Sequence, residues 1–277
     1  MKEYHKNELV TVSIEDIGIE GEGIGKVDGF TLFVKDAVPG DVISAKILKS
    51  KKTYAYARLE KVETPSPFRR EPVCAFHRSC GGCQLQTLSY EKQLEFKEKK
   101  IANNLIRLGG FTSEYVKERM EPIVGMEDPF HYRNKAQYPV GTDKEGHPIA
   151  GFYAGRTHCI IANTKCYLGA EENEKIMETI LSYMKQNKVS AYDETTGKGL
   201  IRHVLIRKSF QEGELMVCIV VNKDIKSLPN QEKLVEALRK IDKMTSVSLS
   251  INTENTNVIM GSTIRQIWGS PTISDAI

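Results

Sequence analysis

The sequence predicts a multi-domain α+β protein, in which a small OB-like β-barrel precedes a cysteine segment and an α+β central domain. Three observations support this prediction. Residues 9–63 alternate apolar and polar side chains in short runs between glycines and prolines, which is typical of the strands of a small closed barrel. Three cysteines then fall within ten residues. Beyond them, runs with the period of a strand mix with runs with the period of a helix, as in α+β proteins.

The composition is that of a globular protein. The chain has 277 residues, of which 40% are hydrophobic and 27% charged, and this balance excludes collagen-like, fibrous and disordered chains. No apolar run approaches the roughly 18–20 residues that span a bilayer, and the N-terminus has no apolar signal segment. We therefore expect a cytoplasmic protein without a membrane partner. Thiols stay reduced in that compartment, so the six cysteines are expected to be metal ligands or core residues.

Residues 1–65 are predicted to form the barrel. About five strands in fewer than 70 residues is the size of an OB-like fold, and the runs VTVSIEDI, FTLFV, DVISAKIL and TYAYARLEKV are the four clearest candidates for them. The glycine-rich stretch GEGIGKVDG has the composition of a phosphate-binding loop, but it does not open a helix. We therefore interpret it as a bend between strands.

The charge of the barrel is uneven. Residues 1–45 carry four Lys/Arg against nine Asp/Glu, whereas residues 46–70 carry eight against two. A basic surface of this kind usually meets a polyanion, although a solvated face of mixed charge is the plainer alternative. The segment KILKSKKTYAYARLEK interleaves cations with tyrosines, and such residues bind phosphates and stack on bases. The predicted RNA contacts here are Lys49, Lys51, Lys52, Tyr54, Tyr56 and Arg58.

A linker and the cysteine segment follow, over residues 66–90. ETPSPFRREPVC is rich in proline and is the clearest linker in the chain. The cysteines Cys74, Cys80 and Cys83 have the spacing Cys-x5-Cys-x2-Cys and enclose a Gly-Gly pair. Three thiolates this close can bind one soft metal centre, around which the glycines let the backbone turn tightly.

A fourth ligand must come from elsewhere, because structural zinc sites and iron–sulfur clusters usually take four. Cys218 lies in the apolar run MVCIVV and is expected in the core. The spacing does not choose between Cys159 and Cys166. It does not choose the metal either, since His77 and His158 keep a mixed zinc site open.

Residues 91–265 are predicted to form the central domain. Residues 266–277 are predicted to be the truncated start of a further domain. Helices are expected over 91–108, 171–188 and 230–243, and paired strands over GLIRHVLIRKSF and ELMVCIVVN. SVSLSIN, NVIM and STIRQIW are expected as closing strands. Cations and amides in HYRNK and in the strand GLIRHVLIR are predicted to add RNA contacts. For His203 the alternative is a structural role in the strand. The predicted contacts here are Arg133, Asn134, Lys135, Arg202, His203 and Arg207.

These motifs together resemble the iron–sulfur RNA (uracil-5-)-methyltransferases, the 23S ribosomal RNA type included. GEGIGKVDG with LFVKDAVPGDVISAKI is similar to a TRAM domain, and CAFHRSCGGCQLQTLSYEKQLEFK to the family's cluster motif. HYRNKAQYPVG and GLIRHVLIR match further family stretches. The resemblance implies RNA as partner, most specifically 23S ribosomal RNA. It also implies a [4Fe-4S] cluster, with the fourth ligand in GFYAGRTHCIIANTKCYL. The implied ligands are Cys74, Cys80, Cys83 and Cys166.

One departure from the family concerns catalysis. In the family, a domain after these motifs carries a glycine-rich S-adenosylmethionine loop and a nucleophilic cysteine near Asn-Pro, and this sequence contains neither. The resemblance therefore implies S-adenosylmethionine as cofactor of the full-length enzyme only, with no catalytic or cofactor-binding residue named here. We expect the chain alone to bind RNA without methylating it. We also expect self-association through the apolar face of helix 91–108.

Two other classes of protein compete with this interpretation. A complete, non-catalytic RNA-binding protein with structural zinc would be colourless, whereas a cluster protein would be brown and contain iron and sulfide. A radical S-adenosylmethionine enzyme with a TRAM domain has Cys-x3-Cys-x2-Cys spacing and a C-terminal barrel. Here the first gap is five residues and the barrel is N-terminal, so we rank that class lower.

Overall fold

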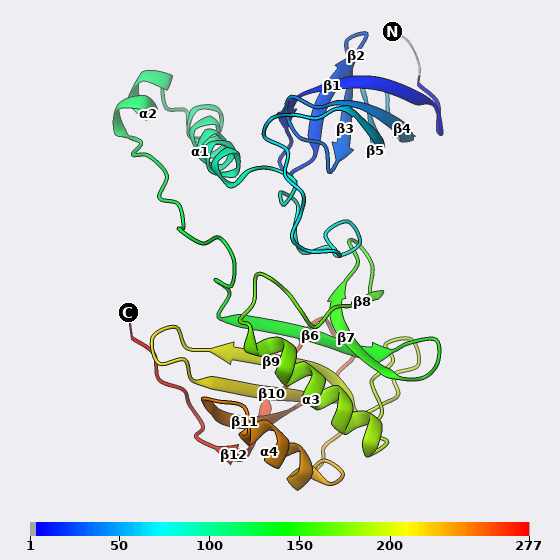
Figure 1. Ribbon diagram of the computed structural model, residues 1–277, viewed down its shortest axis with the longest axis vertical. Helices are drawn as coiled ribbons and strands as arrows, with labels where there is room; N and C mark the ends of the chain where they lie inside the picture. The colour runs from blue at the N-terminus through cyan, green and yellow to red at the C-terminus, as the bar shows by residue number, and fades with distance from the viewer. Residues whose placement is uncertain (1–3, 277) are drawn as a thin grey trace. The chain divides into compact units, whose positions relative to one another are not determined.

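The computed structural model describes residues 4–276. These residues divide into two compact units (Figure 1). We call the first the barrel unit, which runs to Arg78 and continues over Cys83–Glu127. We call the second the sheet unit, which comprises Ser79–Gly82 and the chain from Asp128 onward. The cysteine segment therefore contributes residues to both units.

The barrel unit begins with five strands. Four of them match the predicted runs, but the interpretation of GEGIGKVDG as a bend is wrong, because Gly23–Val27 within it form a strand that pairs on both sides with its neighbours. The five strands are β1 (Leu9–Ile17), β2 (Gly23–Val27), β3 (Phe30–Lys35), β4 (Val42–Ser50) and β5 (Tyr54–Thr64). They close in the order β1-β2-β3-β5-β4. Alternate residues point inward because side chains alternate across a strand, and the fully buried ones include Leu32, Val34, Ile43, Ala45, Ile47 and Ala55.

A buried carboxylate attaches the linker to the barrel. Asp41 is fully buried and accepts hydrogen bonds from the backbone N–H of Val38 (2.8 Å) and of Ser66 (2.9 Å). The Arg69 guanidinium also donates to it, at 3.0 Å from Nε and 2.5 Å from Nη2. A buried charge needs such partners, so the first residues of the predicted linker are held against the barrel.

Two helices complete the barrel unit. α1 (Tyr90–Arg107) agrees with the expected helix over 91–108, and none of its residues is buried. α2 (Ser113–Arg119) was not predicted, although Thr112 caps it by accepting a hydrogen bond from the backbone N–H of Tyr115 at 3.2 Å. Both helices group with the barrel, whereas the sequence placed residues from 91 onward in the central domain.

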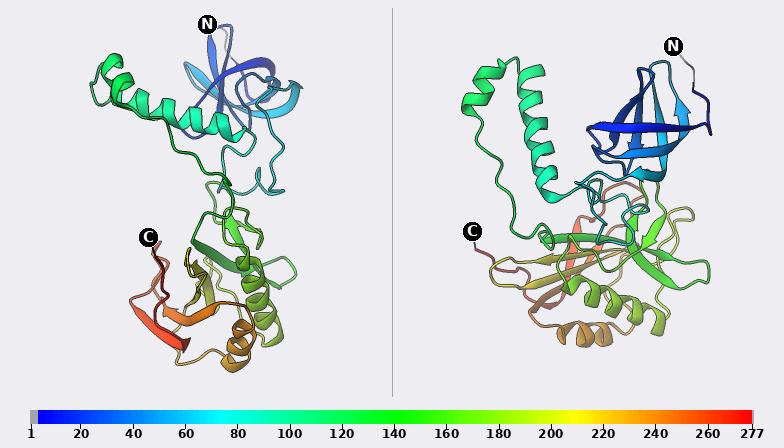
Figure 2. Two further views of the ribbon diagram at one scale, coloured as in Figure 1. Left: turned by 60° about the vertical axis from the view of Figure 1, so that its left-hand side comes forward. Right: turned by 45° about the horizontal axis from the view of Figure 1, so that its top comes forward.

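The sheet unit is a seven-stranded sheet of order β12-β11-β10-β9-β6-β7-β8. Its helices α3 (Glu172–Gln186) and α4 (Gln231–Arg239) cover one face of the sheet (Figure 1, Figure 2). All neighbouring strands are antiparallel except β10 and β11, which α4 connects. The strands are β6 (Lys135–Thr142), β7 (Pro148–Tyr153), β8 (Ile160–Ala162), β9 (Ile201–Lys208), β10 (Leu215–Val221), β11 (Met244–Ile251) and β12 (Thr263–Gly269).

The core of the sheet unit lies between the sheet and these two helices, as their apolar faces predict. The residues predicted to face inward from α3 and α4 are buried or half-buried, and the strands contribute an apolar face opposite them. The main fully buried members are Tyr138, Ile176, Ile180, Met184, Val204, Val217, Leu234 and Leu238. The antiparallel pair expected at 199–222 is confirmed as β9 and β10.

The expected strand NVIM is wrong. Residues 257–260 form a loop, because the Asn252 side chain donates hydrogen bonds to the carbonyl oxygens of Val258 (2.7 Å) and Ile259 (2.9 Å). Ile259 then packs on the small cluster around Cys218, on the face of the sheet away from α3 and α4. No helix within residues 4–276 is both long and apolar enough to cross a membrane.

Candidate functional site

Three aromatic rings cluster on the outside of the barrel. Phe33 on β3 pairs in register with Tyr56 on β5, and their ring centroids lie 5.8 Å apart. Tyr54 is 5.6 Å from each of them, edge-on to both. We call these residues the aromatic triad. Sequence reasoning found the two tyrosines and missed Phe33, whose outward position follows from the inward Leu32 and Val34 on either side of it.

Lysines without ion-pair partners flank this triad. Lys49 lies opposite Tyr56 in the β4–β5 register, and Lys51 and Lys52 lie in the turn that follows β4. All three are exposed, and within residues 4–276 no acidic side chain pairs with them. Arg58 differs, because its guanidinium donates to Glu60 at 2.6 Å and 2.9 Å. Its charge is therefore partly neutralised, and we weight it below the lysines as a phosphate contact.

A cavity of about 610 Å³ lies beside β6 in the sheet unit. It brings together three of the predicted RNA contacts with the predicted fourth cluster ligand. We call it the β6 cavity. Its lining residues are Tyr132, Arg133, Asn134, Lys135, Ala136, Gln137, Tyr138, Phe152, Cys166 and Gly169.

Strand pairing explains why this cavity exists. β6 pairs with β9 from Lys135 onward, but it pairs with β7 only at Val140–Thr142. The last residues of β7, Gly151–Tyr153, pair with β8 instead. The sheet therefore opens beside the first half of β6. The backbone before β6 is held to the Cys166 segment by hydrogen bonds that include Arg133 N–H to the Leu168 carbonyl oxygen at 2.9 Å.

The four predicted cluster ligands are divided between the units. Cys74 and Cys83 belong to the barrel unit, whereas Cys80 and Cys166 belong to the sheet unit.

Tyr138 lines the β6 cavity together with Cys166. Burial, with a smaller contribution from the charge of Cys166, raises the pKa of the Tyr138 hydroxyl.

The end of β7 fixes Cys80 in the sheet unit. Cys80 forms a bridge with Ala154, and the Gly81 N–H donates to the Tyr153 carbonyl oxygen at 3.0 Å. A Cβ on Gly81 would lie 2.9 Å from the Gly155 Cα, so this close approach requires glycine.

The cysteines outside the predicted ligand set differ in exposure. Cys159 is exposed, whereas Cys218 is 7% exposed within the sheet. Burial raises the pKa of the Cys218 thiol. None of the six cysteines, all within residues 4–276, forms a disulfide.

The three predicted contacts on β9 separate into two groups. Arg202 is 6% exposed, donates to the carbonyl oxygens of Asn252 (2.9 Å) and Glu254 (2.8 Å), and lies 4.5 Å from the Tyr192 ring centroid. His203 is also buried, and burial, with the neighbouring Arg202 charge, lowers its pKa to about 4. We interpret both residues as structural.

Arg207 is the exposed member of the three. It lies directly opposite Lys135 in the β6–β9 register, so the two cations are neighbours across the strands. Neither has an acidic partner within residues 4–276. Like charges placed directly opposite each other destabilise a sheet, and a bound anion would relieve that repulsion.

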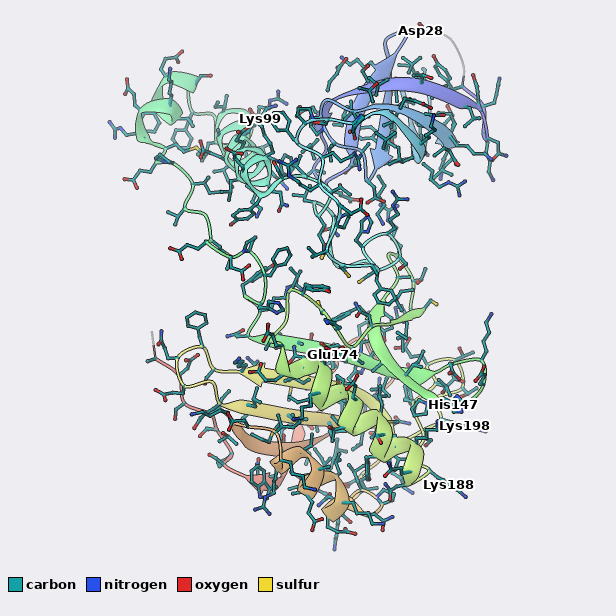
Figure 3. All side chains as sticks on the ribbon, viewed as in Figure 1. Asp28, Lys99, His147, Glu174, Lys188 and Lys198 are labelled. Atoms are coloured by element: carbon teal, nitrogen blue, oxygen red, sulfur yellow. The ribbon has the colours of Figure 1, made fainter. Side chains whose placement is uncertain are left out.

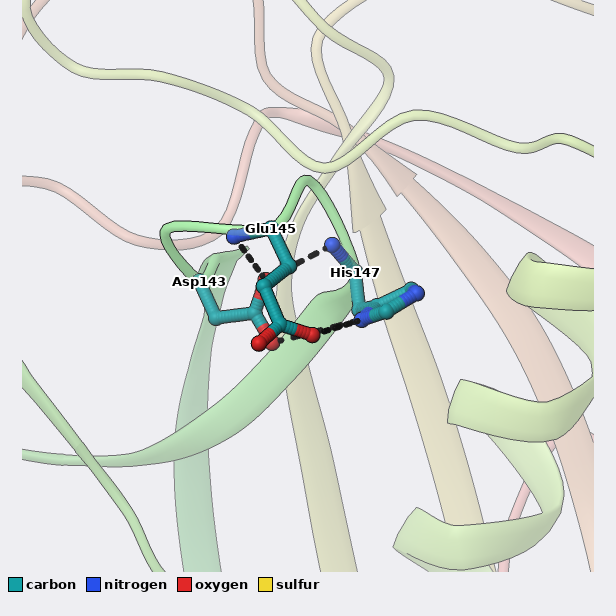
Figure 4. A group of neighbouring side chains, drawn as sticks. All are labelled: Asp143, Glu145 and His147. Atoms are coloured by element: carbon teal, nitrogen blue, oxygen red, sulfur yellow. Dashed lines mark hydrogen bonds and ion pairs between the residues drawn. The ribbon is translucent and has the colours of Figure 1, made fainter.

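One further group has the side chains of a metal site. Asp143, Glu145 and His147 lie in the exposed β6–β7 turn (Figure 4), and His147 is also labelled in Figure 3. The Asp143 carboxylate accepts hydrogen bonds from the backbone N–H of Glu145 (2.9 Å) and His147 (2.8 Å). The His147 bond is the main reason that the pKa of Asp143 lies below its usual value. These bonds within the turn account for the grouping, and we assign it no ion.

Comparisons with known proteins agree with the barrel and with the overall fold. The family model of the TRAM domain matches residues 5–59. Over 98% of its length the chain is 41% identical to an uncharacterized RNA methyltransferase of Clostridium acetobutylicum, and 39% identical to one of Bacillus cereus. It spans 58% of the length of each.

A solved structure has the same fold. The crystal structure of the Pyrococcus abyssi tRNA (uracil-54, C5)-methyltransferase with S-adenosyl-L-homocysteine superposes with a TM-score of 0.68 at 23% identity. The match covers 96% of this chain and 57% of that one. The iron–sulfur cluster stays a prediction.

Proposed function

We propose that this chain is the RNA-binding portion of an S-adenosylmethionine-dependent RNA (uracil-C5-)-methyltransferase. The observation that carries the proposal is the aromatic triad on the barrel, bordered by Lys49, Lys51 and Lys52, which have no acidic partners within residues 4–276. The TRAM match and the relatives named RNA methyltransferases support it. We propose ribosomal RNA of the 23S type as the substrate of the whole protein.

The triad and its lysines have the two features that single-stranded RNA requires. Aromatic rings stack on bases without regard to sequence, and each stacked base contributes about 1–3 kcal/mol. Lysine side chains neutralise phosphates as mobile point charges. Folded RNA has to expose its target base before methylation, and contacts of this kind replace the stacking that the exposed bases lose.

Alanine substitutions at the triad test RNA binding. Tyr54→Ala and Tyr56→Ala are each expected to weaken binding of a fluorescent single-stranded RNA by about tenfold, measured by anisotropy. Phe210→Ala is the matched control, because Phe210 is 79% exposed in the sheet unit. If all three variants bind like the unmodified protein, the triad is not an RNA site.

We further propose a [4Fe-4S] cluster on Cys74, Cys80, Cys83 and Cys166. Two observations support this proposal: the four cysteines form no disulfide, and Cys166 lines the β6 cavity. The thiolates of these four cysteines are the soft ligands that such a cluster would take. Structural zinc on the same thiols is the competing occupant. Iron and sulfide analysis of anaerobically purified protein separates the two, because zinc brings neither sulfide nor colour.

We propose that the chain alone does not transfer methyl groups. Covalent catalysis on uracil needs a reactive thiolate, and four cysteines are assigned to the cluster. Cys218 is a poor nucleophile because burial raises its pKa, and the sequence identifies no activating base for the exposed Cys159. Incubation with methyl-labelled S-adenosylmethionine and ribosomal RNA tests this directly. Label in the RNA above a control without protein would refute it.

A further inference from the structure

The edge of β6 that faces the β6 cavity has unpaired backbone groups. In the antiparallel β6–β9 pair, the Lys208 N–H donates to the Asn134 carbonyl oxygen at 2.9 Å, and Ala136 lies opposite Ile206. Backbone groups alternate in direction along such a pair. Even-numbered residues of this stretch therefore bond to β9, and Lys135 and Gln137 turn their N–H and C=O groups toward the opposite edge.

No strand occupies that opposite edge beside Lys135 and Gln137. β7 joins β6 only at Val140–Thr142, and within residues 4–276 no backbone or side-chain partner bonds to the main chain of Lys135 or Gln137 on this side. Pro139 follows on the same edge, where its missing N–H costs no hydrogen bond to β9. Two N–H groups and two C=O groups are therefore available along one wall of the cavity.

The side chains around this edge favour a nucleotide. Tyr132 is 46% exposed at the cavity, and Phe152 lines it with its ring packed on the buried Tyr138, at a centroid distance of 4.9 Å. Lys135 lies opposite the exposed Arg207, with no acidic partner for either within residues 4–276. An extended peptide could also use a strand edge, but unneutralised cations select a polyanion.

We propose that the β6 cavity binds one unstacked base of the RNA. The main-chain N–H and C=O groups of Lys135 and Gln137 pair with the edge of that base, and Lys135 with Arg207 holds a neighbouring phosphate. Bases of single-stranded RNA present donors and acceptors side by side on their pairing edges, as an open strand does. The inference rests on the proposed RNA binding and assigns this unit a contact separate from the aromatic triad.

Hydrogen–deuterium exchange on the unmodified protein tests the proposal first. A saturating single-stranded RNA of mixed sequence is expected to slow exchange at the Lys135 and Gln137 amides at least tenfold. Protein reconstituted with iron and sulfide and protein freed of metal are measured side by side. Slowing in both forms supports the proposal. Slowing only in the metal-free form overturns it, because the cavity would then belong to the cluster.

A proline substitution isolates the main-chain contact. Gln137→Pro removes an N–H that β9 does not use, whereas the matched control Gln137→Ala removes the side-chain amide and keeps that N–H. We expect RNA binding about tenfold weaker for Gln137→Pro and within about twofold of the unmodified protein for Gln137→Ala. Thermal melting establishes that both variants fold, and if the proline variant does not, the exchange result decides.

The two proposals fail in different ways. If the protein binds no RNA at all, the proposed function is wrong and this inference falls with it. If RNA binds, but the exchange of Lys135 and Gln137 is unchanged and the two Gln137 variants bind alike, only the cavity inference is overturned.

Discussion

Replacing Lys49, Lys51 and Lys52 together by alanine is expected to flatten the salt dependence of RNA binding. Each phosphate neutralised on single-stranded RNA contributes about −0.7 to the slope of log affinity against log salt. The three side chains are exposed and have no acidic partner within residues 4–276, so each is available for a phosphate. With a fourth phosphate contact elsewhere on the chain, the slope of the unmodified protein is about −3, and that of the triple variant about −1.

The assay is fluorescence anisotropy with a short single-stranded RNA between 50 and 200 mM salt. Over that fourfold range the unmodified protein is expected to lose about 50-fold in affinity and the triple variant about threefold. The matched control replaces Lys226, Lys233 and Lys240, which are exposed in the sheet unit. It removes the same total charge and is expected to keep the slope near −3.

Two outcomes would refute the reasoning about the barrel lysines. An unchanged slope in the barrel triple variant would place the phosphate contacts elsewhere. An equal flattening in both triple variants would show that net charge, and not the position of the lysines, controls binding.

Three further predictions concern the cysteines and the stability of each unit. Cys166→Ser is expected to lower the iron content per chain more than Cys159→Ser, and equal losses would remove Cys166 as the fourth ligand. Asp41→Ala leaves Arg69 without its buried carboxylate partner. Urea unfolding should then show the barrel unit to be about 3–5 kcal/mol less stable. A loss below about 1 kcal/mol would contradict this expectation. Burial lowers the pKa of His203 to about 4 in the folded protein. Below pH 6.5 this histidine therefore binds a proton more readily in the unfolded chain than in the folded one. The free energy of unfolding should consequently decline as the pH falls toward 4. The decline amounts to about 3 kcal/mol, and His203→Gln should reduce it in urea titrations at pH 7 and pH 4.5.

The barrel shows how far local patterns reach. Side chains alternate across a strand, so a run such as FTLFV reveals its inward and outward residues without any knowledge of its neighbours. Four of the five strands, α1, α3 and α4 were predicted from such periods, whereas β2 was missed because its glycines were interpreted as a bend. α2 was missed because seven residues are too few for a helical period to stand out. The grouping of α1 and α2 with the barrel was also missed, because unit membership depends on contacts between distant segments.

The candidate site shows where local patterns stop. The sequence by itself determined which residues are cations, amides, aromatics and thiols, and it located Cys74, Cys80 and Cys83 in one segment. Arg202 and Arg207 are five residues apart in one strand, and that spacing places them on opposite faces. The sequence could not show that Arg202 is buried over Tyr192 while Arg207 is exposed, because the burial of each face depends on what packs against it.

Only the tertiary structure decided the β6 cavity. Its open edge exists because β7 leaves β6 after three paired residues and pairs with β8. Its available backbone groups belong to Lys135 and Gln137 because the register against β9 uses those of Ala136 and Tyr138. Register and strand order are set by the packing of whole layers and not by any single run of residues. For that reason the sequence identified the side chains at this site but not the backbone between them.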